Sequence, residues 1–422
     1  MLFVKIKTPE KTVIKVLGIT VYLKQKFSYQ TDRKIFFFKF SKFNLNYFNE
    51  RINFLIEQNA RLEENLKKIV RLKYLNERIR QAKYVHFVIN DKFIQPYVSL
   101  IESRFNSKEH LFLCKKALDY IDFPRGESVA EFLPGDIKSL EFTRDNKFIF
   151  QSAFDTEVVK FFAVNKNLLS KTAWFLWGGD LYNAQRNDIE DTFRREVRIV
   201  SCCVKKDYLN VVSTYNSHNM YVKATIPGPI SKIDLIKYSN KKSLRKKSTI
   251  NIQINNSADK TTLDMLKVLS RFKNEDICIT TILSYGDLEF ADEIVKLGKE
   301  IFKEKFIFID KYMSADEYTN HLSHQDIFIL YQNRQQGLGN ITSCLAMGSK
   351  CYVRHDVSSI DFFNDLLLKV FDSRKIKNMS FSEFIDYEPI VKVENINNAL
   401  KIYSEDEYVK GFSNLFKALE NL

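Results

Sequence analysis

Residues 327–340 read IFILYQNRQQGLGN, and this segment gives the clearest indication of the fold. Its first four residues, Ile327–Leu330, are all apolar and predict a buried strand. The polar segment after them contains two glycines in the spacing G-x-G and leads into a helix predicted over Ile341–Met347. A strand, a short polar loop and a helix form the repeating unit of a parallel sheet that helices cover on both faces.

The same alternation of strands and helices continues on both sides of this stretch. In the second half, the other predicted strands are 249–254, 277–283, 306–309 and 351–353. In the first half, the predicted strands are 85–89, 111–114 and 173–177. Because Pro227-Gly228-Pro229 interrupts the pattern, we predict an α/β protein with two Rossmann-like domains, over 84–228 and 229–422. A cleft between them would face the carboxyl ends of both sets of strands.

Two further segments precede these domains. Residues 1–45 combine short β-type runs, among them Ile35–Phe40, with lysines, and predict a basic β appendage. This appendage either lies on an anionic membrane surface or packs on the next helix. Residues 46–83 predict a long amphipathic helix with apolar residues three and four apart. This helix either pairs with a second copy of the chain, giving a homodimer, or packs on its own chain.

The composition is that of a folded protein with more than one core. The chain has 422 residues, of which 45% are hydrophobic and 28% charged. Its formal net charge of +13 favours an anionic partner, either a membrane surface or a phosphorylated substrate. Nucleic-acid-binding motifs are absent from the sequence, so we expect no nucleic acid partner. The six cysteines contain no C-x-x-C pair, which indicates reduced thiols in the cytoplasm. No apolar run is long enough to cross a bilayer, so any membrane contact would be peripheral.

Three polar loops of the second half follow strands and are candidates for binding a nucleotide. Backbone N–H groups at the start of a helix favour a phosphate group. Glycines let the ligand approach the backbone closely, and arginine adds a fixed positive charge. The alternatives are ordinary helix caps and tight turns. The candidate residues are Asn256, Ser257, Asp259, Tyr285, Gly286, Arg334, Gln336, Gly337, Gly339 and Asn340.

Two carboxylates of the first half are candidates for activating an acceptor. Asp180 follows Trp177-Gly178-Gly179 at a predicted strand end, and Asp91 lies in the loop after the strand 85–89. At such a position, a carboxylate can take a proton from a substrate hydroxyl, although Asp180 would equally suit a helix N-cap. His86 lies inside an apolar strand and is expected in the core. No histidine has a convincing metal-ligand spacing, and neither half carries a D-x-D motif, so we expect no metal and no bound cofactor.

The order of four motifs resembles one known family. The motifs are W-G-G-D-L-Y at 177–182, N-S-A-D at 256–259, L-S-Y-G at 283–286 and R-Q-Q-G-L-G at 334–339. Their succession is similar to that of the TDP-N-acetylfucosamine:lipid II N-acetylfucosaminyltransferases of enterobacterial common antigen assembly, over about Tyr84 to Asp372. Residues 1–82 have no counterpart in that family, and the loop at Asn90-Asp91 matches it only loosely.

The resemblance implies a GT-B fold and transfer of a deoxyamino sugar from a nucleotide diphosphate, TDP, to a polyprenyl-diphosphate-linked saccharide. It also implies a peripheral enzyme on the cytoplasmic face of the bacterial inner membrane. The competing hypothesis is a non-catalytic scaffold that joins a glycan assembly complex at the membrane. The intact N-S-A-D and R-Q-Q-G-L-G motifs argue against a scaffold.

Overall fold

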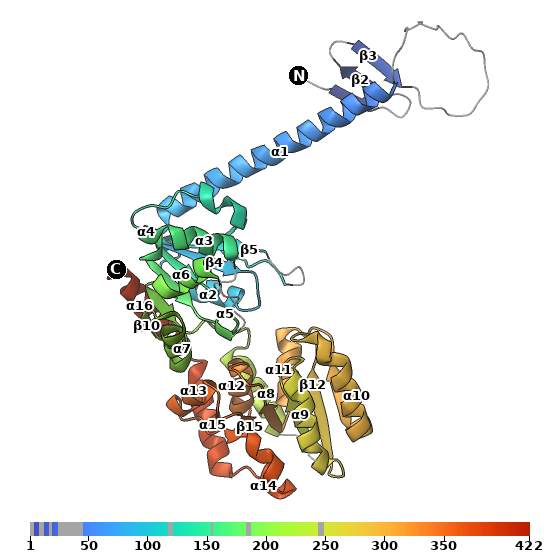
Figure 1. Ribbon diagram of the computed structural model, residues 1–422, viewed down its shortest axis with the longest axis vertical. Helices are drawn as coiled ribbons and strands as arrows, with labels where there is room; N and C mark the ends of the chain where they lie inside the picture. Colours follow the sequence, from blue (N-terminus) through green and yellow to red (C-terminus); the bar gives the residue numbers. More distant parts are fainter. Residues whose placement is uncertain are drawn as a thin grey trace, which may run out of the picture. The chain divides into compact units, whose positions relative to one another are not determined.

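In the computed structural model, the described residues are 4–7, 12–16, 19–23, 45–116, 121–152, 155–182, 187–243 and 249–422 (Figure 1). The chain divides into two compact units, residues 1–66 and 67–422. In the first unit, β1 (Val4–Lys7), β2 (Thr12–Val16) and β3 (Ile19–Leu23) form an antiparallel sheet in that order. The predicted run Ile35–Phe40 lies outside the described residues.

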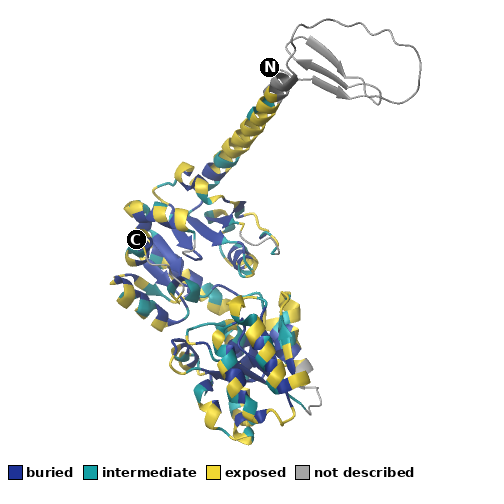
Figure 2. Ribbon diagram, turned by 45° about the vertical axis from the view of Figure 1, so that its right-hand side comes forward, coloured by how far each residue is buried: buried dark blue, intermediate teal, exposed yellow. Residues whose placement is uncertain are grey.

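Helix α1 (Leu45–Gln81) begins in the first unit and ends in the second. Its last turns belong to the core of the first Rossmann-like domain, because Leu75 and Ile79 are fully buried there. Arg71 donates two hydrogen bonds to the buried Asp136 carboxylate, at 3.0 and 2.6 Å. Its middle turns, by contrast, are largely exposed (Figure 2). None of the helices in the described ranges has the length and apolar content that a membrane crossing needs.

The first Rossmann-like domain is built on a parallel sheet with the strand order β10-β9-β8-β7-β4-β5-β6. Its strands are β4 (Tyr84–Ile89), β5 (His110–Lys115), β6 (Val129–Glu131), β7 (Lys147–Phe150), β8 (Thr172–Phe175), β9 (Ile199–Ser201) and β10 (Met220–Val222). Its helices are α2 (Ile94–Arg104), α3 (Thr156–Val164), α4 (Lys166–Leu169), α5 (Gly178–Tyr182), α6 (Asp188–Glu196) and α7 (Lys205–Tyr215).

His86 in β4 is a core residue, as expected from its apolar neighbours. The side chain is fully buried, and its ring nitrogens lie 2.8 Å from the Tyr97 hydroxyl and 2.9 Å from His110. Burial holds the pKa of His86 well below its ordinary value, so the ring stays neutral.

The second Rossmann-like domain has a parallel sheet with the order β13-β12-β11-β14-β15-β16. Its strands are β11 (Ile250–Ile254), β12 (Ile277–Ile282), β13 (Phe306–Ile309), β14 (Ile327–Leu330), β15 (Lys350–Val353) and β16 (Phe371–Asp372). Its helices are α8 (Lys232–Ser243), α9 (Lys260–Leu269), α10 (Ala291–Phe302), α11 (Ala315–Ser323), α12 (Leu338–Ala346), α13 (Ser359–Asp365), α14 (Phe381–Ile385) and α15 (Pro389–Ile402).

Both sheets reverse their strand order beside the first strand of the domain. In the first sheet the reversal lies between β4 and β7, and in the second between β11 and β14. At a reversal, the two connecting helices leave toward opposite faces, so a crevice opens at the carboxyl ends of the two strands. The fold therefore offers one ligand crevice in each domain.

The last helix corrects one expectation about the domains. Residues 229–422 were expected to form one domain, but α16 (Glu405–Glu420) packs on the first domain beside β10 (Figure 1). The reason is an apolar stripe on α16 that fits the α2 side of the first sheet, where Phe412 stacks on Tyr97 at 4.9 Å. Gly411 allows this approach, because an added Cβ would lie 3.1 Å from the Ala224 Cα.

Candidate functional site

The crevice of the second domain begins at Asn255, directly after β11. Asn255 has a positive φ of 50° and is fully buried. Its side-chain oxygen accepts a hydrogen bond from the Tyr331 backbone N–H at 2.9 Å, and its amide donates to the Thr262 hydroxyl at 2.8 Å. Asn255 thus ties the loop after β11 to the loop after β14 and to α9. This role of Asn255 is not evident from the sequence, although asparagine adopts the left-handed conformation more readily than most residues.

The predicted Asn256 and Ser257 meet two glutamines of the loop after β14. The Ser257 hydroxyl oxygen accepts hydrogen bonds from the side-chain amides of Gln332 and Gln336, each at 2.9 Å. The Gln336 amide also lies 3.3 Å from the Asn256 side-chain oxygen. Asn256, Ser257 and Gln332 are no more than 5% exposed. The structure therefore brings three predicted residues together and adds Gln332, which sequence reasoning missed because only folding brings it beside Ser257.

Gly286 joins the loop after β12 to the same crevice. It has a φ of +105°, and an added Cβ would lie 2.4 Å from the Ala258 carbonyl oxygen. The Ala258 N–H donates to the Tyr285 carbonyl at 2.8 Å, and the Asp287 N–H donates to the Ala258 carbonyl at 2.9 Å. Only glycine permits this backbone pairing. Tyr285 presents an exposed side chain next to it.

Asp259 serves as the N-cap of α9. Its carboxylate accepts hydrogen bonds from the Thr261 N–H at 2.8 Å and from the Thr261 hydroxyl at 2.5 Å. The structure thus assigns Asp259 the capping role that was its alternative interpretation.

The loop after β14 turns into α12 through Gly337. Gly337 is the N-cap of the helix with a φ of +66°, and an added Cβ would lie 3.2 Å from the Asn256 side-chain nitrogen. Gly339 and Asn340 lie in the first turn of α12. An added Cβ at Gly339 would meet no atom of the described residues within 4 Å. The first turn of α12 is consequently open on the Gly339 side.

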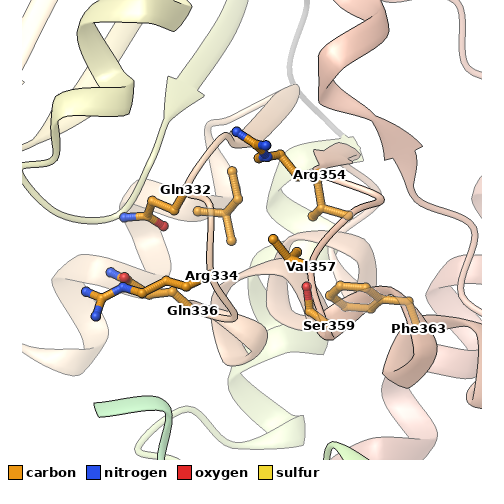
Figure 3. Close-up of a pocket in the computed structure, with 9 residues that line it drawn as sticks. Gln332, Arg334, Gln336, Arg354, Val357, Ser359 and Phe363 are labelled. Carbon is orange, nitrogen blue, oxygen red and sulfur yellow. The ribbon is translucent and has the colours of Figure 1, made fainter. Parts of the chain in front are cut away.

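A small cavity of about 10 Å³ lies beside this loop (Figure 3). Figure 3 shows Gln332, Arg334 and Gln336 on one side of it, and Val357 and Phe363 on the other. A volume of this size holds about one water molecule.

Arg354 also lines this cavity and was not anticipated from the sequence. Its guanidinium group donates to both oxygens of Asp356, at 2.9 and 2.7 Å, and lies 5.5 Å from the centre of the Tyr331 ring. These hydrogen bonds lower the pKa of Asp356 to about 2, so the pair stays ionised.

The crevice of the first domain contains Asp91. One carboxylate oxygen accepts from the Phe93 N–H at 2.8 Å, and the other accepts from the Gln151 side-chain amide at 3.0 Å. Gln151 follows β7, so this contact crosses the crevice between β4 and β7. Burial raises the pKa of Asp91 above its ordinary value. Asp91 also lines a pocket of about 450 Å³, together with Lys92, Gln95, Ile121, Asp122, Phe123, Pro124 and Arg125.

Asp180 does not have the open position that the sequence analysis expected. It is only 2% exposed, and its carboxylate accepts hydrogen bonds from the Ser152 hydroxyl at 2.8 Å, the Trp174 indole at 3.2 Å and the Trp177 N–H at 3.1 Å. The local reason is that α5 begins at Gly178, which turns Asp180 back toward β8. With three donors and almost no accessible surface, the Asp180 carboxylate stabilises the start of α5.

Contacts near the candidate site connect the two domains. An added Cβ at Gly178 would lie 2.7 Å from the side-chain oxygen of Gln335, so the loop after β14 lies against the end of β8. Asp207 accepts hydrogen bonds from the Tyr182 hydroxyl at 2.7 Å and from the Ser358 hydroxyl at 2.5 Å. The loops after β14 and β15 therefore lie close to the first domain.

The arrangement suits transfer between two bound ligands. The second domain offers a helix start, an arginine and neutral hydrogen-bonding groups, which suit a phosphorylated ligand. The first domain offers a carboxylate with a raised pKa beside a pocket, which suits proton transfer. In the described ranges, no three His, Cys, Asp or Glu side chains gather as metal ligands would. Transfer without a metal stays a prediction.

The solved structures that resemble the chain share its fold. An E. coli trehalose-6-phosphate protein bound with UDP-2-fluoro glucose aligns with a TM-score of 0.53 and 8% identity, over 80% of this chain and 99% of that one. A glycosyltransferase from Rickettsia africae aligns with a TM-score of 0.54 and 10% identity, over 80% and 98%. MnaA of S. aureus with UDP aligns with a TM-score of 0.51 and 11% identity, over 80% and 97%. These matches confirm the expected GT-B architecture.

The sequence comparisons identify the family. No curated protein matches the chain. A family profile described as 4-alpha-L-fucosyltransferase, glycosyl transferase group 56, matches residues 117–383, which is more than half of the chain. This profile confirms the resemblance that the four motifs indicated. The chain belongs to the glycosyl transferase group 56 family and is a nucleotide-sugar-dependent glycosyltransferase.

Proposed function

We propose that the chain transfers a deoxyamino sugar from a nucleotide diphosphate, TDP, to a lipid-linked saccharide in surface polysaccharide synthesis. The observation that carries the proposal is the pair of ligand crevices, one at β11/β14 and one at β4/β7, in domains that meet where Gln335 lies against Gly178. The donor binds in the second crevice and the acceptor in the first. The structural relatives that hold UDP or UDP-2-fluoro glucose support a nucleotide sugar as the donor.

On the donor side, transfer breaks the bond between the anomeric carbon and the diphosphate oxygen. The leaving diphosphate carries away the bonding electrons and gains negative charge. Arg334 and the backbone N–H groups at the start of α12 stabilise this charge without a metal ion. Tyr285 and Gly286, at the end of β12, lie next to the nucleoside.

On the acceptor side, the hydroxyl oxygen attacks the anomeric carbon and its proton passes to the Asp91 carboxylate. The Gln151 amide and the Phe93 N–H hold that carboxylate at the crevice. The adjoining pocket of about 450 Å³ is large enough for a sugar ring, and Lys92 and Arg125 in its wall suit an acceptor with a phosphate group.

The test of the donor site compares Arg334→Ala with Arg354→Ala. Loss of Arg334 should weaken UDP or dTDP binding by about 1.5–3 kcal/mol, the range for hydrogen bonds to charged groups. Arg354 lines the same cavity, but Asp356 already accepts from its guanidinium, so its loss should have a smaller effect. Equal affinities in wild type and Arg334→Ala would remove Arg334 from the site. Transfer from dTDP- and UDP-sugars to extracted lipid-linked acceptors then tests the reaction itself.

We further propose that the chain associates peripherally with the cytoplasmic face of the inner membrane through its basic residues 1–43. The support is the net charge of +13 and the lysines among the apolar residues of this segment. Each basic residue near an anionic surface contributes about 1 kcal/mol, which salt screens. High salt should release the protein from anionic vesicles, and removal of residues 1–43 should reduce binding without altering nucleotide affinity. Equal vesicle binding by the shortened chain would contradict this proposal.

The exposed part of α1 supports a homodimer. Ile56, Leu62, Leu66 and Ile69 are each 61–64% exposed. The last three follow the four- and three-residue spacing of a coiled-coil seam. We infer that a second copy of α1 covers this seam. Analytical ultracentrifugation should show a dimer that Leu62→Lys dissociates, whereas Glu63→Lys next to it should not. A monomeric wild-type chain at micromolar concentration would contradict this proposal.

A further inference from the structure

Two buried amide oxygens in the donor crevice have no hydrogen-bond partner among the described residues. They are the side-chain oxygens of Gln332 and Gln336, and both residues line the small cavity beside Arg334. Gln332 is only 3% exposed. A buried acceptor that stays unpaired destabilises the folded protein, so each such group in a native structure calls for an explanation.

The surrounding contacts set the direction in which the two oxygens point. Both amide nitrogens are held by Ser257, and the Gln336 nitrogen also lies 3.3 Å from the Asn256 oxygen. Because these acceptors bind the nitrogen side of each amide, the oxygen side faces away from Ser257. Among the polar side chains that line the cavity, Arg334, Arg354 and Ser359 can donate hydrogen bonds. The oxygens of Gln332 and Gln336 can each accept one from an O–H or N–H group of a bound ligand.

The position of the cavity favours the sugar over the nucleoside. Four neighbouring strands of the sheet have the order β12-β11-β14-β15, and α12 follows β14. The loop after β12, which contains Tyr285, therefore lies on one side of the start of α12. The cavity lies on the other side, between the ends of β14 and β15. The diphosphate lies between the two in the proposed function. The loop after β14 also contacts Gly178 of the first domain, so the cavity is on the side toward the acceptor.

We propose that Gln332 and Gln336 determine donor specificity by accepting hydrogen bonds from a hydroxyl or N–H substituent of the transferred sugar. The proposal rests on the proposed function, because it requires a nucleotide sugar in this crevice. The volume of about 10 Å³ admits one such group and no larger one. A sugar that lacks the substituent leaves both oxygens buried without a partner, and the site rejects it for this reason.

A cycle that combines protein variants with donor analogues tests the proposal. The variants are Gln332→Met and Gln336→Met, which keep the side-chain length and remove the acceptor. The matched control is Gln335→Met, since Gln335 lies in the same loop but faces Gly178. The probes are UDP- and dTDP-hexoses and analogues in which fluorine, which cannot donate a hydrogen bond, replaces one hydroxyl at a time. Titration calorimetry measures the affinity of each probe and of free UDP and dTDP.

In the wild type and the control, fluorine at one ring position should weaken binding about ten- to a hundredfold. In Gln332→Met or Gln336→Met, the same exchange should have almost no further effect, with the affinity of each variant for free UDP or dTDP measured as its own reference. Equal losses in wild type and both variants at every position would overturn the proposal, and a resident water would then account for the cavity. A wild-type chain that binds no nucleotide or nucleotide sugar would overturn the proposed function as well.

Discussion

Replacing Gly339 with alanine, in the first turn of α12, should weaken nucleotide binding without lowering the stability of the fold. An added Cβ there meets no atom of the described residues within 4 Å, and Gly339 does not have a positive φ. In the first turn of a helix, alanine is favoured over glycine by about 0.4–1 kcal/mol. The variant should therefore unfold at the same temperature as the wild type or up to a few degrees higher.

A bound nucleotide diphosphate would respond differently to the same methyl group. Phosphate oxygens approach backbone N–H groups to about 2.7–3.2 Å, whereas a carbon atom requires about 3.5–4.0 Å. The methyl group would displace the diphosphate and lengthen hydrogen bonds to a charged group, each worth about 1.5–3 kcal/mol. The dissociation constants for UDP or dTDP should consequently rise about ten- to a hundredfold.

Gly337→Ala is the matched control two residues earlier. Gly337 has a φ of +66°, and its added Cβ would lie 3.0 Å from a Leu330 methyl carbon. This variant should lose about 1–2 kcal/mol of stability, because the left-handed backbone is unfavourable for alanine. Thermal unfolding and titration calorimetry with UDP and dTDP measure both effects. A folded Gly339→Ala protein with wild-type affinity would refute the reasoning, because no diphosphate could then lie over that turn.

Three other predictions follow from the site. Asp91→Asn should lower turnover about 10²- to 10⁴-fold with little change in nucleotide affinity. Burial raises the pKa of Asp91, so a base at this position loses its negative charge at a higher pH than an ordinary carboxylate does. Wild-type activity should therefore fall as the pH is lowered through this raised pKa. A pH–rate profile without such an acidic limb would argue against Asp91 as the base. Asp180→Asn should lose about 1.5–3 kcal/mol of stability for each weakened hydrogen bond. If the unfolding temperature is unchanged and turnover is abolished, Asp180 becomes a catalytic candidate again. Transfer should persist in EDTA, so loss of activity that magnesium or manganese restores would contradict a metal-independent mechanism.

The domain contact can be tested in the same assays. Gly178→Ala places a methyl group 2.7 Å from the Gln335 side-chain oxygen. That side chain must move, so turnover should fall more than nucleotide affinity, because the contact joins the donor loop to the acceptor domain. Gly135→Ala is a suitable control in the same domain, since its nearest atom, a Glu157 side-chain oxygen, lies 3.8 Å away. An equal effect of the two substitutions on turnover would show that the contact at Gly178 does not matter for transfer.

The α/β class and the polar loops after β11, β12 and β14 are predictable from the sequence, because their signals are local. Apolar runs such as Ile327–Leu330 form β14 over the same residues, since continuous apolar strands are buried on both faces in a parallel sheet. Glycines of the donor loops mark positive-φ turns at Gly286 and Gly337, where other residues are strained. The four motifs also pointed to the family, because motif order is a property of the chain alone.

Which residues lie together, and which are accessible, depends on the folded arrangement of the whole chain. Strand order places Gln151 against Asp91, sixty positions away in the chain, and Gln332 against Ser257. In the folded chain, Asp180 is buried and α16 packs on the first domain. Hydrophobic periodicity indicates that one face of a helix or strand is buried, but it does not indicate which other element covers that face. Contacts between distant residues depend on the packing of whole layers, and for this reason the unpaired amide oxygens became visible only in the folded chain.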